Sequence, residues 1–205
     1  MSFITAWCHI NGKSIHVNGA QLLENVEPSI EAFLKDIYKN LQIEYPKFYK
    51  MDMLSKTAFL ASEAMKRVNP DIFTYADDQI ALVFSNKNSS ADTDLKFQKS
   101  YMENAAPGPA LFVYTLPNIL IGELAIRNKW YGENLFTVFP VFDPVFFVNY
   151  CSVLLSRQSK ACLCGWVNVI DETEVFLFFV EDKMRNEQSL ELNPETLNDL
   201  YTKYN

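Results

Sequence analysis

Four cysteines and two histidines are the first residues of this chain to consider as nucleophiles, general bases or metal ligands. A cysteine nucleophile needs a neighbour that stabilises its thiolate, and a structural zinc site needs four ligands at workable spacing. Cys162 and Cys164 are two residues apart in an apolar segment, so both point to one face of a strand, but no further pair of ligands accompanies them. We therefore expect buried core thiols, the commonest role of a free cysteine, at Cys8, Cys151, Cys162 and Cys164.

Neither histidine has an acidic or cysteine-containing constellation around it in the sequence. His9 follows Cys8 in an apolar segment, and we interpret it as a satisfied or solvent-facing residue of a strand. His16 is bounded by glycine and asparagine residues, which predicts a solvated turn. The chain has no phosphate-binding glycine loop and no dinucleotide fingerprint, so we predict neither a cofactor nor a metal site.

The elements that must position these residues alternate between strands and helices. Apolar segments predict strands over residues 3–10, 80–84, 135–139, 161–170 and 175–180. Helical spacing of apolar residues predicts helices over residues 29–41, 52–68, 94–102, 117–127 and 143–155, with a short one over 193–201 in a polar tail, 183–205. Ser29 is the expected cap of the first of these helices. This alternation predicts an α/β fold of three layers, in which helices cover both faces of a mixed sheet.

Residues 135–155 form an apolar stretch that is long enough to span a membrane. Pro140, Asp143 and Pro144 interrupt it near its middle, where a lipid-facing helix would carry them at high cost. The stretch instead predicts a buried strand, a sharp turn and a core helix, with Asp143 as the helix cap and Pro144 at the first helical position. We therefore predict no membrane span.

The composition argues against several classes of partner. The 205 residues are 49% hydrophobic and carry a net charge of -7, which suits one acidic globular domain. An acidic balance without a run of lysine or arginine argues against a nucleic-acid surface and against a broad basic face for an acidic carrier protein. The start of the chain lacks the features of a signal peptide, so we expect a cytoplasmic protein with reduced thiols.

Several short segments occur in an order and spacing that is similar to a known family. Lys50-Met51-Asp52 precedes an alanine-rich helix, residues 109–127 carry a Pro…Pro-Asn…Gly pattern, and Gly132-Glu133-Asn134 leads into a strand. These segments resemble the N-terminal half of the β-ketoacyl-ACP synthases (3-oxoacyl-ACP synthases), which belong to the thiolase-like superfamily. The resemblance implies a thiolase-like N-terminal domain over residues 1–182, and it runs without a gap from Gly132 to Gly165.

The departures from the family concern its chemistry. In the family, the strand after the Gly-Pro-Asn turn ends at the cysteine that accepts the acyl group. Carried over residue by residue, that cysteine falls on Val141, and a flexible glycine becomes Pro144. Since valine cannot hold an acyl group, the resemblance implies a strand–turn–helix elbow without its nucleophile.

The family's remaining catalytic residues are histidines, or a histidine and an asparagine, of its second half. This chain has about half the family's length, and its two histidines, His9 and His16, match none of those positions. We therefore expect no condensation chemistry from this chain alone, although the family's own activity is that of an acyltransferase.

The first hypothesis is a non-catalytic partner subunit. Two subunits of this family pair through the strand before the nucleophile, across a two-fold axis. The resemblance therefore implies that this chain pairs with a full-length ketosynthase through Leu135, Phe136, Thr137, Val138 and Phe139. Such a subunit would act like a chain-length factor in fatty acid or polyketide/polyene-type biosynthesis, and an acyl carrier protein would reach it through the partner.

Aromatic residues around the elbow suit the lining of an acyl channel. The pocket candidates are Phe139, Val141, Phe142 and Phe146. Ordinary core packing explains their apolar character equally well, so both interpretations stay open at this point.

Two further hypotheses belong to other classes. In one, the chain is a stand-alone homodimer that binds an acyl ligand without chemistry, since a two-fold interface is self-complementary. In the other, it is an active transferase with an unrecognised nucleophile. This hypothesis requires other residues to supply the nucleophile, the base and the oxyanion partner, which are all missing together.

Overall fold

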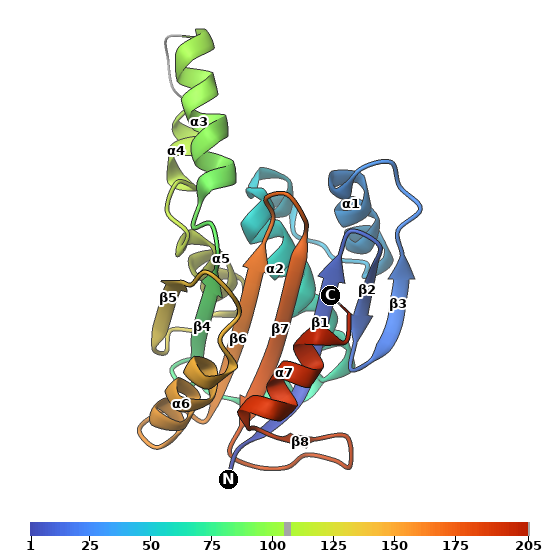
Figure 1. Cartoon of the computed structure of the whole chain (residues 1–205), viewed down its shortest axis with the longest axis vertical. Helices are drawn as coiled ribbons and strands as arrows, with labels where there is room; N and C mark the ends of the chain where they lie inside the picture. Colours follow the sequence, from blue (N-terminus) through green and yellow to red (C-terminus); the bar gives the residue numbers. More distant parts are fainter. Residues whose placement is uncertain (105–107, 205) are drawn as a thin grey trace.

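The computed structural model describes residues 1–104 and 108–204, so Asn205, the last residue of the predicted tail, lies outside the described residues. Within these residues, eight strands form one mixed sheet in the order β3-β2-β1-β7-β6-β4-β5, with β8 beside β1 (Figure 1). The pairs β4–β5 and β4–β6 are parallel, and the other pairs are antiparallel. The strands are β1 Phe3–Asn11, β2 Ser14–Val17, β3 Ala20–Glu24, β4 Ile80–Asn86, β5 Asn134–Val138, β6 Ala161–Asn168, β7 Glu174–Glu181 and β8 Leu190–Glu191.

The helices begin where the sequence supplies capping side chains. Ser29, Asp52, Asp143 and Asn193 each accept a hydrogen bond from a backbone N–H in the first turn of a helix, which satisfies a donor that the helix itself leaves free. The helices are α1 Ile30–Asn40, α2 Met53–Val68, α3 Ala91–Asn104, α4 Pro109–Val113, α5 Ile119–Asn128, α6 Pro144–Leu155 and α7 Pro194–Thr202, with short 3-10 turns at Pro46–Lys50 and Pro70–Thr74. The predicted caps Ser29 and Asp143 are confirmed.

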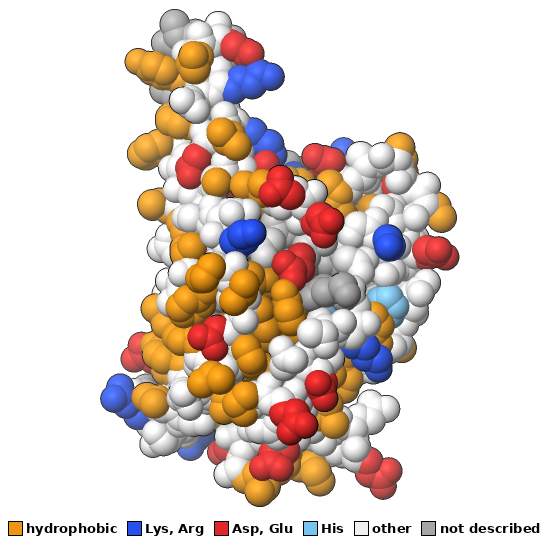
Figure 2. All heavy atoms as spheres, viewed as in Figure 1, with side chains coloured by type: hydrophobic (Ala, Val, Ile, Leu, Met, Phe, Trp, Pro, Cys, Tyr) orange, Lys and Arg blue, Asp and Glu red, His pale blue; other side chains and the backbone are white. Residues whose placement is uncertain are grey.

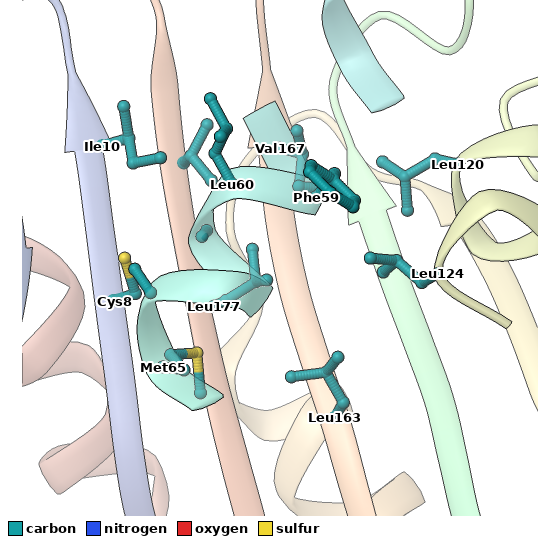
Figure 3. Packing of buried hydrophobic residues seen from close by; sticks show 14 of the residues in the cluster. Cys8, Ile10, Phe59, Leu60, Met65, Leu120, Leu124, Leu163, Val167 and Leu177 are labelled. Carbon is teal, nitrogen blue, oxygen red and sulfur yellow. The ribbon is translucent and has the colours of Figure 1, made fainter. Parts of the chain in front are cut away.

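Two apolar cores lie on opposite faces of the sheet. On one face, α1, α2 and α5 pack on the strands, and Phe59 of α2 lies close to Leu120 of α5 and Val167 of β6 (Figure 3). On the other face, α6 and α7 cover the strands through residues such as Phe147 and Leu197. The result is three layers with a mixed sheet in the middle, so the predicted α/β class is confirmed.

One predicted turn is wrong. His16 lies in β2, which pairs with both β1 and β3. The turn of this hairpin is the next pair, Asn18-Gly19, whose φ angles are 48° and 85°. Asparagine and glycine tolerate this left-handed region best, which makes the pair a strong hairpin signal.

The last part of the chain packs on the body of the protein. Strand β8 pairs with β1, and α7 buries Leu197 and Leu200 in the core of the second face. No helix of the described residues is long and apolar enough to cross a membrane.

Candidate functional site

Strand β5 lies at one end of the sheet (Figure 1). It pairs in parallel with β4 over five residues, from Leu82↔Asn134 to Asn86↔Val138. Within the described residues no strand covers its other side. An edge of this kind presents unpaired N–H and C=O groups that can template the addition of another strand.

The direction of the backbone groups of β5 follows from two hydrogen bonds at its ends. The carbonyl of Glu133 accepts from Leu82 N at 2.9 Å, and Phe139 N donates to the carbonyl of Asn86 at 2.9 Å. In a parallel pair the N–H and C=O of one residue point to the same side, and the side alternates along the strand. Odd-numbered residues of β5 therefore face β4, whereas Phe136 and Val138 point their backbone groups to the free edge.

The chain after β5 forms the predicted strand–turn–helix elbow. It leaves the sheet at Val138 and enters α6, where the Asp143 carboxylate accepts from Phe146 N at 3.0 Å. Pro144 occupies the first helical position, where its missing N–H costs nothing. Strand and helix thereby hold the intervening residues in a fixed, tight turn.

The tip of the elbow is exposed and carries no reactive group. The Val141 side chain is 67% exposed. A valine there cannot attack a thioester, since it has neither a hydroxyl nor a thiol. The neighbouring valines Val138 and Val145 are also exposed, so the edge strand and the elbow share an apolar surface.

The aromatic pocket candidates divide into two sets. Phe142 is buried and stacks on Tyr201 of α7 at 4.3 Å between ring centroids, with Trp166 and Phe176 also in contact. Phe139 and Phe146 are only half-buried and lie edge to face at 4.8 Å. The structure thus brings Phe139 and Phe146 together near the edge, while Phe142 fixes the elbow to the core.

The cysteines are core residues, as predicted. All four thiols are free and buried. The sulfur atoms of Cys151 and Cys164 lie 3.3 Å apart between α6 and β6. Burial raises the pKa of the Cys8 and Cys164 thiols above its ordinary value. A thiol that stays protonated and inaccessible is a poor nucleophile.

The histidines contribute no base to the elbow. His9 is buried rather than solvent-facing; it stacks on Phe176 at 4.5 Å, and Phe176 also contacts Phe142. Burial lowers the pKa of His9 to about 3, so its ring is neutral near pH 7. His16 stacks on Tyr204 at 4.3 Å, beside the last helix.

A second apolar surface, which was not predicted from the sequence, lies on α3 and α4. These helices project beyond the sheet from the side that carries β4 and β5 (Figure 1). Figure 2 shows hydrophobic side chains on this projection and farther down the same side of the molecule. An available signal was the scatter of apolar residues over residues 91–104, which fits no single buried stripe.

Comparison with solved structures identifies the fold. The chain superposes on "The ishigamide ketosynthase/chain length factor" with a TM-score of 0.67 and 18% identity, over 91% of this chain and 63% of that chain. The fold is that of the ketosynthases and chain length factors. The predicted thiolase-like architecture is therefore confirmed.

Two other solved complexes agree. "Ketosynthase (ApeO) in Complex with its Chain Length Factor (ApeC) from Xenorhabdus doucetiae" gives a TM-score of 0.61 at 12% identity, over 89% of this chain and 80% of that chain. "AntDE:AntF (apo): type II PKS acyl-carrier protein in complex with its ketosynthase bound to the hexaketide" gives 0.60 at 11%, over 89% and 62%. The chain thus spans less than two thirds of the ishigamide and AntDE chains. No family model and no curated protein matches the sequence.

Proposed function

We propose that this chain is a non-catalytic ketosynthase-like subunit that pairs with a full-length ketosynthase, in the manner of a chain length factor. The observation that carries the proposal is the free backbone edge of β5, directly before an elbow whose tip is Val141. The structures that share the fold include complexes of ketosynthases with chain length factors, which supports a pairing role.

The proposed contact is the addition of one strand to the sheet. An antiparallel strand of the ketosynthase hydrogen-bonds to the outward backbone groups of Phe136 and Val138, which extends the sheet into the partner. Main-chain hydrogen bonds supply affinity in such an addition, and the side chains on either face supply specificity. Strand β5 is uncharged along its length, so no buried charge opposes the contact.

The proposed role of the elbow is to shape the space that receives the growing acyl chain. Val141 and the half-buried Phe139 and Phe146 form the apolar surface that this chain brings to the interface. The ketosynthase supplies the nucleophile and receives the acyl carrier protein. Larger side chains at the elbow shorten the space, so this subunit sets product length in a fatty acid or polyketide/polyene-type pathway.

The test begins with the affinity-tagged chain in the organism's own cells and mass spectrometry of the proteins that co-purify. The ketosynthase identified in this way is then produced recombinantly, mixed with the purified chain, and sized by light scattering. The proposal predicts a stable complex with one copy of each chain. If the chain instead forms only a homodimer with itself, it is a stand-alone homodimer rather than a partner subunit.

A further inference from the structure

The two helices that project from the body, α3 and α4, expose a set of large apolar side chains. We call this set the arm surface. Leu95 and Met102 of α3 are 62% and 76% exposed. Met102 follows Leu95 by seven positions, which is close to two helical turns, so both side chains lie on one side of the helix. The full set is Leu95, Tyr101, Met102, Phe112, Val113 and Leu116.

The arm contributes almost nothing to the core of the protein. Among the described side chains of α3, only Thr93 is buried, and α4 has no buried residue. The two helices contact one another through Phe97 and Phe112, whose ring centroids are 5.7 Å apart. The exposed apolar side chains of the arm remain available for a further contact. Such a contact would also stabilise α3, because a helix of this length is marginal in water without tertiary contacts.

Polar contacts fix the base of the arm to the body. The Tyr114 hydroxyl donates to Glu123 of α5 at 2.9 Å, and Ser90 Oγ donates to the carbonyl of Thr115 at 2.7 Å. The Thr93 hydroxyl donates to the Asp52 carboxylate at 3.1 Å. These bonds anchor both ends of the arm where it joins the body, so its direction relative to β4 and β5 is set before any partner binds.

The β5 edge alone offers only a short contact. A stable interface buries about 800 Å² on each partner, and the five residues of β5 extend over only about 17 Å. Helix α3 has 14 residues, which adds about 21 Å along the same side of the molecule.

We propose that the arm surface binds the same ketosynthase that pairs with β5. This inference rests on the proposed function, and it names the second half of the interface. The partner presents an apolar groove beside its own edge strand, and Leu95 and Met102 fill that groove. The arm's charges largely pair within α3, as Asp92–Lys96 and Lys99–Glu103, which leaves apolar packing as the source of affinity.

The test compares two double variants in binding to the recombinant ketosynthase by calorimetry. Leu95→Glu with Met102→Glu places two charges on the arm surface, and glutamate keeps the helix propensity of α3. Val26→Glu with Met184→Glu is the matched control, because both residues are exposed and Val26 follows β3 at the opposite edge. We expect the arm variant to bind about 100-fold more weakly and the control to bind within about threefold of the original chain.

Hydrogen exchange gives an independent readout with the unmodified chain. We expect the amides of residues 91–104 to exchange more slowly when the ketosynthase is added. If the chain binds but the arm variant keeps full affinity, or these amides gain no protection, the arm inference is overturned while the pairing through β5 stands. If the unmodified chain does not bind the ketosynthase at all, the proposed function fails and the arm inference fails with it.

Discussion

The two edges of the sheet, β3 and β5, differ in how readily they can pair with a strand of another chain. Strand β3 ends in Glu24, exposes Gln21, and pairs with β2 through an irregular register between Ile15 and His16. Strand β5 has no charge, and its register with β4 is regular. Charges and bulges are the devices that keep sheet edges from pairing with other chains. The protein protects the β3 edge and leaves the β5 edge able to accept a strand.

The largest effect is expected where the β5 edge meets the core. Phe142→Ala removes a ring that touches Tyr201, Trp166 and Phe176, and the free energy of unfolding should fall by about 3–5 kcal/mol. Chemical denaturation measures the change. The control is Val141→Ala at the neighbouring exposed position, with a change within about 0.5 kcal/mol. Equal losses for the two variants would mean that the elbow is not divided into a core residue and a surface residue.

The second effect tests directly whether β5, and not β3, is the edge that binds the ketosynthase. Val138→Pro removes an N–H that points to the free edge and spares the bonds to β4, so affinity for the ketosynthase should fall at least about 100-fold, or about 2.7 kcal/mol. Val138→Ala keeps the N–H and should bind within about threefold. Gln21→Lys at the β3 edge should leave affinity unchanged. A proline variant that binds as tightly as the alanine variant contradicts strand addition at β5.

The smallest effect concerns the middle of the sheet, away from both edges. Burial lowers the pKa of His9 from 6.5 to about 3. As the pH falls through about 6.5, the His9 ring therefore gains a proton in the unfolded chain but stays neutral in the folded protein. Stability is therefore lost as the pH falls, by about 1 kcal/mol between about pH 6.5 and about pH 5.5. His9→Phe should remove this part of the slope in denaturation curves. An unchanged slope would mean that the ring is not held neutral in the core.

Local signals predicted much of this fold. Ser29 and Asp143 identified the starts of α1 and α6 because a capping side chain acts within one turn. The hairpin of β2 and β3 escaped prediction although Asn18-Gly19 signals it, because the flanking strands have only four and five residues and give short periodic patterns.

The position of the site depends on order in space. No local pattern in residues 134–138 shows whether that strand is central or at an edge, since its neighbours come from distant parts of the chain. Val141 and the arm residue Met102 are exposed because no distant part of the described chain packs on them, and a local sequence pattern does not show this. Periodicity did not show that residues 135–139 could pair with another subunit. That prediction came from the resemblance of Gly132–Gly165 to a known elbow.

The measurement that tests the central claim most directly is residue-resolved amide exchange of β5 in the free chain and in the complex with the ketosynthase. In the free chain, the amides of Leu135 and Thr137 face β4 and should exchange slowly, whereas those of Phe136 and Val138 face the edge and should exchange fast. We predict that Phe136 and Val138 become protected in the complex by at least about tenfold. If both amides exchange at the same rate with and without the ketosynthase, no strand is added at this edge and the account is wrong.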